Sequence, residues 1–375
     1  MEIIKAYKVK IYPNKEQQEL LLKTIGSCRW IWNHYLEKKT KSYTELGENI
    51  TYKEMSADMT QLRKQTDWLL EVQFQPLQQS LRNLDGAYNK FFRKRTQFPK
   101  FKSKYNPRQS FQKAIGWRLE EHKIQIQEDV AVRARGMLPK TDNLGTLTIS
   151  RQNNKWFASM VAREEIALPK QYTKPIGLDM GLKDLVITST GKKYENITVQ
   201  KRKLKKLKFL QQSLARKKKG GIRRQKAKEE VSNLHCKMTN KRINYLHHVS
   251  KDIVDKNHAM IAVEDLSVAN MMKNHKLARA ISDASWAELV RQIEYKQLWR
   301  GGKFIKINKF FPSSKMCSNC SYLLQSLSLE VRVWICSKCH KKHDRDVNAA
   351  KNILQQARLS LGRERGDGKQ SVMVA

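Results

Sequence analysis

The chain has 375 residues, with 74 Lys and Arg against 35 Asp and Glu, so its formal net charge is +39 and its isoelectric point is near 10.0. This length excludes a single small domain. The excess of positive charge favours a polyanionic partner, nucleic acid above all, and a mean hydropathy of −0.68 without a long apolar run argues against a membrane protein.

The first 105 residues predict a strand followed by helices. Residues 3–11 alternate between apolar and polar side chains, as a strand with one buried face does. Asn14 and Gln17 then form a capping pair at the start of a helix. A second amphipathic helix is expected just after Pro76. Its apolar stripe, which we assign to the core, consists of Leu77, Leu81, Leu84, Tyr88 and Phe91.

Aromatic and basic residues are interleaved in residues 91–111, which read FFRKRTQFPKFKSKYNPRQSF. Such a segment suits single-stranded nucleic acid, because aromatic rings stack on bases and cations contact phosphates. It equally suits a solvated loop whose aromatic side chains anchor it to its domain. The sequence leaves both interpretations open, and the total charge favours the first.

Short strands of alternating polarity are expected between residues 110 and 165, at 123–127, 130–134, 147–151 and 156–162. Asn153 and Asn154 suit a hairpin turn between the last two. Because the chain also opens on a strand, we infer a small β-barrel that is split by a helical insertion. This architecture requires residues 3–11 to pair with strands between residues 110 and 165.

Three acidic residues in the C-terminal half stand at predicted element ends. Asp179 lies in an apolar strand pattern, PIGLDMGL, and Glu264 ends another, HAMIAVE, where open α/β sheets form their sites. Asp346 precedes a good helix former, NAAKNILQQAR, and follows a further strand expected at 303–310. Each acid also has a purely structural interpretation: a turn aspartate, a surface acid at a strand end and a helix N-cap, respectively. Asp265 would point to the face opposite that of Glu264.

If these acids converge, their repulsion of about 1 to 4 kcal/mol per pair must be offset by bound cations. Carboxylates with open water positions suit Mg²⁺ or Mn²⁺. Such ions activate the attacking water and stabilise the leaving 3′ oxygen of a phosphodiester. A metal-dependent nuclease is therefore the first hypothesis.

Four cysteines form two CxxC pairs with fifteen residues between the pairs. They are Cys317, Cys320, Cys336 and Cys339. This spacing is typical of a tetrahedral Cys₄ zinc ribbon, in which no ligand position stays open and the zinc is structural. His340 and His343 are alternative ligands, but four cysteines already complete the site. Cys28 and Cys236 are expected to be free thiols.

The combination of GLDMGLKDL, VEDLSV, the paired CxxC knuckles and DRDVNAAKNI, in this order, resembles the TnpB (OrfB) family of bacterial insertion-sequence transposons. That family is related to the type V CRISPR effectors. The segment FPKFKSK…SF matches as well, and the resemblance extends from the first strand to about Gln356. It implies an RNA-guided double-stranded DNA endonuclease that cuts guide-matched DNA next to a short transposon-adjacent motif.

The resemblance also implies the site residues and partners. Asp179, Glu264 and Asp346 would be the catalytic acids and would hold Mg²⁺ or Mn²⁺, with Asp344 the rival for the third place. The four cysteines would hold one structural Zn²⁺. The partners would be a guide RNA derived from the transposon end and double-stranded target DNA. A monomer with one RNA is expected, without membrane association, in the bacterial cytoplasm on the nucleoid.

The implied fold is multidomain α+β, with a split β-barrel carrying a helical insertion, followed by an RNase H-like (RuvC) α/β domain containing a zinc-ribbon insertion. The expected boundaries are 1–12 and 106–170 for a wedge-type barrel, 13–105 for the helical recognition insertion, 171–310 and 345–358 for the nuclease domain, 311–344 for the ribbon and 359–375 for a disordered tail. Residues 201–228 contain fourteen Lys or Arg and no acid, and would lie beside an RNA–DNA hybrid. The structural interpretation of the same residues is a solvated helical hairpin that turns at Gly220 and Gly221.

Three rival functions stay open. They are a nuclease-dead, RNA-guided repressor of the same family, a guide-independent transposase with an RNase H fold, and a zinc-ribbon RNA-binding protein without catalysis. The presence of all three acids argues against the repressor, and the ribbon argues against the transposase.

Overall fold

The computed structural model divides the chain into two units, Met1–Ile166 and Ala167–Ala375, which are described separately. It describes residues 1–196, 201–328 and 330–366, without the side chains of 201 and 362–366. Residues 367–375 of the expected disordered tail lie outside the described residues.

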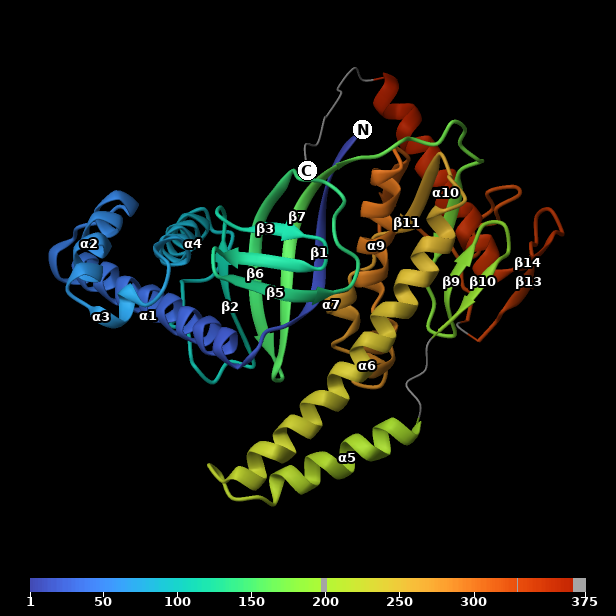
Figure 1. Ribbon diagram of the computed structural model, residues 1–375. Coiled ribbons are helices and arrows are strands. Elements are labelled where there is room, and N and C mark those ends of the chain that lie inside the picture. Colours follow the sequence, from blue (N-terminus) through green and yellow to red (C-terminus); the bar gives the residue numbers. More distant parts are fainter. Residues whose placement is uncertain (197–200, 329, 367–375) are drawn as a thin grey trace. The chain divides into compact units, whose positions relative to one another are not determined.

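A seven-stranded sheet forms the framework of the first unit, in the order β2-β6-β7-β1-β5-β4-β3 (Figure 1). Strand β1 pairs antiparallel with β7 on one side and with β5 on the other. The predicted pairing of the first strand with residues 110–165 is therefore confirmed, whereas closure into a barrel stays a prediction. The strands are β1 (Glu2–Tyr12), β2 (Arg108–Lys113), β3 (Arg118–Glu120), β4 (Lys123–Gln127), β5 (Val130–Arg135), β6 (Leu144–Gln152) and β7 (Lys155–Glu165).

The hairpin between β6 and β7 turns where the sequence predicts it. Asn153 and Asn154 have φ values of 49° and 58°, the left-handed conformation that a tight two-residue hairpin turn requires at both positions. Asparagine tolerates this conformation better than most residues.

The helices of the first unit are α1 (Lys15–Leu46), α2 (Tyr52–Lys64), α3 (Asp67–Leu70) and α4 (Phe74–Phe92). The capping box predicted for α1 is confirmed, because Asn14 Oδ1 accepts from Gln17 N at 2.8 Å and Asn14 N donates to Gln17 Oε1 at 3.0 Å. The predicted start of α4 was wrong, since the helix begins at Phe74 and includes Pro76. Proline is tolerated there because the first-turn N–H groups of a helix have no intrahelical partner.

The second unit contains a five-stranded sheet in the order β10-β9-β8-β11-β12. Strand β11 is parallel to both β8 and β12, and β9 is antiparallel to β8. The expected strand 303–310 ends early, because Asn308 turns the chain by accepting the N–H of Phe310 on its side chain and that of Phe311 on its carbonyl. The strands are β8 (Ile176–Asp179), β9 (Asp184–Thr188), β10 (Lys193–Glu195), β11 (Met260–Glu264) and β12 (Lys303–Ile307).

Helices cover both faces of this second sheet. Ile261 and Val263 belong to the apolar core shared with α6, α8 and α9, whereas Met260 and Ala262 belong to the core shared with α10. Helices α5 and α6 form the predicted hairpin, which Figure 1 shows in green and yellow. The helices are α5 (Lys201–Ala215), α6 (Ile222–Val254), α7 (Val268–Met271), α8 (Ala278–Ala284), α9 (Trp286–Trp299) and α10 (Arg345–Gly366), and two short strands, β13 (Val333–Ile335) and β14 (Lys342–Asp344), pair between α9 and α10 in the sequence.

The predicted tail was wrong over its first residues, because α10 continues through Gly366. The apolar stripe of the helix continues as well, since Leu361 packs with Ile353 and Ala357. Within the described residues, no helix combines the length and the apolar character needed to cross a membrane.

Candidate acidic site and cysteine cluster

Strand register brings Asp179 and Glu264 to the same face of the second sheet. In the parallel pair β8–β11, Leu178 lies opposite Val263, and both side chains belong to the core shared with α6 and α9. Successive side chains of a strand point to opposite faces. The next residues, Asp179 and Glu264, therefore point to the face that α10 covers.

Helix α10 approaches β8 so closely that it brings Asp346 to this face. A Cβ atom on Gly177 would lie 2.1 Å from the carbonyl oxygen of Ala350 and 2.9 Å from the backbone nitrogen of Leu354. Only glycine fits between the strand and the helix backbone at this point. Asp346 is the second residue of α10, one turn before Ala350.

The two other carboxylates at this face act on Asp179. Burial, followed by the negative charges of Asp346 and Glu264, raises the pKa of Asp179 to about 8, although Arg345 opposes the shift. Burial also raises the pKa of Glu264, against a hydrogen bond from the Ser313 side chain. Carboxylates that resist ionisation because of one another are relieved by a bound cation. The donor set of this face therefore fits a divalent metal ion such as Mg²⁺.

The two candidates for the third acid have different surroundings. Asp344 Oδ1 accepts the backbone N–H groups of Asp346 at 3.0 Å and of Val347 at 3.1 Å, and its Oδ2 lies 2.8 Å from Lys193 Nζ. Asp344 therefore caps α10, and the capping interpretation of Asp346 was wrong. Asp346 instead lies close enough to Asp179 to raise its pKa, which favours Asp346 as the third acid.

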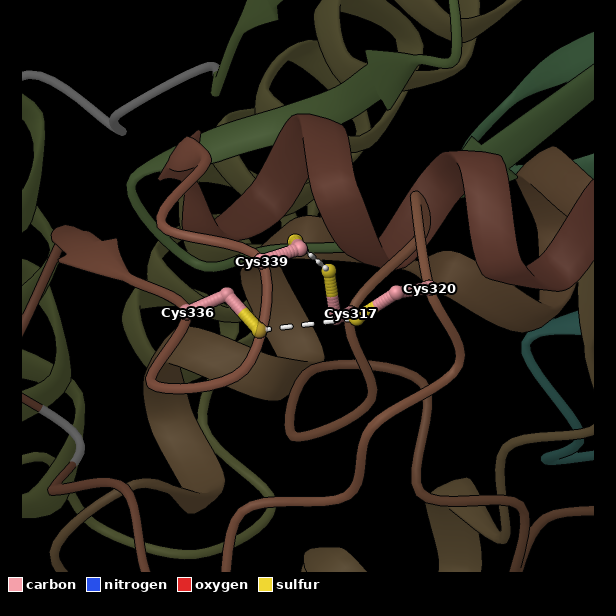
Figure 2. A group of neighbouring side chains, drawn as sticks. All are labelled: Cys317, Cys320, Cys336 and Cys339. Atoms are coloured by element: carbon pink, nitrogen blue, oxygen red, sulfur yellow. Dashed lines mark hydrogen bonds between the residues drawn. The ribbon is translucent and has the colours of Figure 1, made fainter.

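The thiols of the two CxxC pairs converge, as Figure 2 shows. Their four Sγ atoms all lie within 4.8 Å of one another, with 3.6 Å between Cys317 and Cys339 and 3.6 Å between Cys320 and Cys336. Sulfurs bound tetrahedrally at about 2.3 Å from zinc would be about 3.8 Å apart. The cluster is therefore compatible with a structural zinc.

Both CxxC pairs adopt the same backbone turn, which aims their thiols at one point. The residues that follow each pair, Ser321 and His340, are left-handed with φ values of 61° and 54°. The N–H group of Cys317 donates to the carbonyl of Tyr322 at 2.8 Å, and the equivalent bond of Cys336 to Lys341 is 3.0 Å long. The arrangement thus fits the metal by backbone geometry as well as by sulfur spacing.

Two asparagines of α10 hold the first CxxC pair, a role that the sequence analysis missed. Asn348 accepts from the backbone N–H of Ser318 at 2.9 Å and donates to the carbonyl of Met316 at 2.7 Å. Asn352 donates to the carbonyls of Ser313 at 2.8 Å and Met316 at 2.6 Å. Both asparagines are buried. Two amides one turn apart on a helix face that is otherwise apolar could have indicated such a role.

In the first unit, some side chains of residues 91–111 are anchored and others are exposed, so the anchored loop is confirmed in part and the nucleic-acid contact stays a prediction. Asn33 exchanges two hydrogen bonds of 2.7 and 2.9 Å with the backbone of Lys102, and Phe98 packs edge-on against Phe91, which anchors the loop. Phe101 and Tyr105 stay 62% and 77% exposed. The cationic side chains that line an adjacent cavity are Arg29, Lys102 and Arg108.

Three family models match successive parts of the chain. They are a helix-turn-helix domain over residues 1–48, a probable transposase over residues 159–275 and a Cas12f1-like TNB domain over residues 286–353. In this chain the first match comprises strand β1 and the whole of a single continuous helix, α1. The third match includes the cysteine cluster and Asp346.

Relatives align with nearly the whole chain. A Streptomyces pristinaespiralis protein is 37% identical, over 94% of this chain and 89% of its own length, and the InsQ protein of Escherichia coli (strain K12) is 32% identical, over 94% and 92%. The names of both assign them RNA-guided DNA endonuclease activity provisionally. A solved Cas12f1–guide RNA–target DNA complex shares the fold at a TM-score of 0.60, with 13% identity over 94% of this chain and 98% of that chain.

Gly177→Ala should destabilise the second unit by about 1–3 kcal/mol, because the added methyl group overlaps the α10 backbone. Thermal unfolding measures the loss. Gly86→Ala in helix α4 is the control, since a Cβ there meets nothing within 4 Å. An unchanged melting temperature for Gly177→Ala would show that α10 does not lie this close to β8.

Asp179→Asn should stabilise the metal-free protein increasingly as the pH rises. The folded-state pKa of about 8 exceeds the ordinary value of about 3.9. The stability that the protonated Asp179 carboxyl contributes to the folded state is therefore present at low pH and is lost as the pH rises to about 8. The asparagine does not ionise. We expect the melting-temperature difference between variant and wild type, measured in EDTA, to grow from pH 4 to pH 8, and a constant difference would contradict the shift.

Elemental analysis should find one zinc per chain in metal-replete protein, and Cys336→Ser should lose it because three thiols no longer complete the tetrahedron. Cys236→Ser, on helix α6 away from the cluster, should keep it. Absence of zinc from the wild-type protein would refute the zinc-ribbon assignment.

Proposed function

Since the chain belongs to the TnpB (OrfB) family of insertion-sequence proteins, we propose that it is an RNA-guided DNA endonuclease. In this proposal it cuts guide-matched double-stranded DNA next to a short transposon-adjacent motif, on the nucleoid of a bacterial host. The observation that carries the proposal is the convergence of Asp179, Glu264 and Asp346 on one face of the second sheet.

The architecture supports the assignment of the nuclease part. In the five-stranded sheet, β10, β9 and β8 are successively antiparallel, whereas β11 and β12 run parallel to β8. Such a sheet, covered by helices on both faces, suits an RNase H-like (RuvC) domain. The cysteine cluster then corresponds to a zinc-ribbon insertion at 311–344, directly before α10. The seven-stranded sheet and the helices between β1 and β2 correspond to the wedge-type barrel and its recognition insertion.

The proposed reaction is hydrolysis of a phosphodiester. Mg²⁺ or Mn²⁺, when held by the three carboxylates, would supply the charge that activates water and stabilises the leaving oxygen. Asp179 and Glu264 contribute ligand oxygens from neighbouring strand ends, and Asp346 contributes its oxygens from the first turn of α10. Arg332, whose Nη1 lies 3.5 Å from Asp346, balances part of this negative charge in the absence of a cation.

The charge distribution supports nucleic-acid partners. The described part of the basic stretch 201–228 forms helix α5 and the start of α6, and its Phe209 and Ile222 are 68% and 76% exposed. A row of cations on one hairpin suits the two phosphate backbones of an RNA–DNA hybrid, with guide pairing supplying the sequence choice. The exposed Phe101 and Tyr105 suit stacking on unpaired bases. We propose that one chain binds one guide RNA.

A nuclease-dead repressor of the same family is disfavoured because all three acids are present on the same face. A zinc-ribbon protein without catalysis would have no use for a carboxyl whose pKa is raised by two neighbouring acids, and this observation disfavours that alternative. Cleavage assays with and without RNA separate these functions from a guide-independent transposase.

Alanine substitution of Asp179, Glu264 or Asp346 should abolish cleavage of guide-matched DNA in Mg²⁺, by at least about 10³-fold, because each removes ligand oxygens for the cation. Binding to guide RNA and target DNA should persist. Asp344→Asn and Asp265→Asn are the matched controls and should retain cutting, since Asp344 caps α10 and Asp265 is exposed beside the site. Retained cleavage in an alanine variant would remove that residue from the site.

A further inference from the structure

A buried histidine, His343, lies against the cysteine cluster. Its Nε2 atom is 3.1 Å from the Sγ atom of Cys317, and the two residues are only 6% and 0% exposed. Within the part of the chain that the structure describes, the metal-binding atoms that lie together are the four thiols, and the imidazole stands outside this group. His343, which the sequence offered as an alternative ligand, therefore contacts one thiol of the cluster.

Strand pairing and an aromatic contact orient this imidazole. His343 lies opposite Trp334 in the register of β13 and β14, and the centroids of the two rings are 4.7 Å apart with 36° between the ring planes. Trp334 packs in turn with Cys317 and Cys336 in one apolar cluster. The imidazole is thus packed on the indole while its Nε2 atom meets the sulfur of Cys317.

The chemistry of a bound metal sets the direction of this hydrogen bond. A thiol loses its proton when it binds zinc, so the sulfur of Cys317 would accept and Nε2 of His343 would carry the donated proton. Four thiolates carry more negative charge than one Zn²⁺ balances. In a buried site an N–H group aimed at a sulfur offsets part of this charge, and a hydrogen bond to an ionised acceptor is roughly twice as strong as a neutral one.

We propose that His343 is a positioning residue of the zinc site, because its Nε2–H group donates to the Cys317 thiolate, fixes the direction of that ligand and strengthens zinc binding. Hydrogen-bond partners of metal ligands typically change the affinity for the metal by about 10–100-fold. This inference rests on zinc at the cysteines and not on the proposed nuclease function, so the outcome of a cleavage assay does not bear on it.

The tautomer of His343 in the zinc-loaded, full-length protein is the first test. Long-range ¹H–¹⁵N correlation spectra of protein with ¹⁵N-labelled histidine show which ring nitrogen carries a proton, and His343→Gln assigns the signals by their loss. We expect a proton on Nε2. A bare Nε2 atom would overturn the proposal, since that nitrogen would then be a metal ligand or an acceptor. This result stands even if a variant without the donor fails to fold.

Zinc affinity, measured by competition with a chelator, is the second test. His343→Leu keeps a side chain of similar volume without a donor and should raise the Kd for zinc at least about tenfold. His343→Gln, whose amide N–H can reach the same sulfur, should recover most of this loss. Ile335→Ala, at a 62% exposed position on the same hairpin, is the control and should keep the wild-type Kd. An unchanged Kd in His343→Leu, or an equal rise in the leucine and glutamine variants, overturns the assignment.

Co²⁺ in place of zinc separates a hydrogen bond from simple packing. A donated N–H stabilises the lone pairs of the sulfur, so the sulfur-to-cobalt charge-transfer band should move to lower energy in His343→Leu and stay near the wild-type position in His343→Gln. A band that does not move in His343→Leu would show that His343 only fills space. If the wild-type protein binds no zinc, the cysteine site and this inference fail together.

Discussion

The acidic site depends on one steric constraint, the contact of the α10 backbone with β8 at Gly177. A side chain at this position would overlap Ala350 and hold the helix away from the sheet. At the observed separation, Asp346 lies near enough to Asp179 to raise its pKa, although the two acids are far apart in the sequence. The site therefore combines the ends of two adjacent strands with the start of one helix. The helix can approach the strands this closely because Gly177 has no side chain.

The cysteine cluster extends this arrangement rather than forming a separate module. Its first CxxC pair is bound to α10 by Asn348 and Asn352, and the last residue of β14, Asp344, caps the same helix. The ribbon thus contacts α10 at its first turn and along its buried face. A zinc ion held by the cysteines would stabilise the backbone against which the helix packs.

Features encoded within a few neighbouring residues could be predicted from the sequence. The alternation of β1, the capping box at Asn14, the hairpin turn at Asn153 and the paired CxxC spacing each carry their own period or spacing. The start of α4 and the end of β12 could not, because Pro76 is compatible with the first turn of a helix and Asn308 breaks a strand by its side-chain hydrogen bond. The roles of Gly177, Asn348 and Asn352 depend on contacts between distant segments, which no local pattern contains.

The position of Asp346 after both other acids in the sequence has a consequence for synthesis. Domains fold as units while the ribosome extends the chain, N-terminal units first. The first unit can complete its sheet once residue 165 has emerged to pair with Glu2, and the basic hairpin of α5 and α6 follows. Asp179 and Glu264 are synthesised before α10 and before the cysteine segment that precedes this helix. Under the proposed function, a nascent chain acquires surfaces that bind nucleic acid before it acquires its third acid, so a protein still attached to the ribosome could hold its RNA but could not cut DNA.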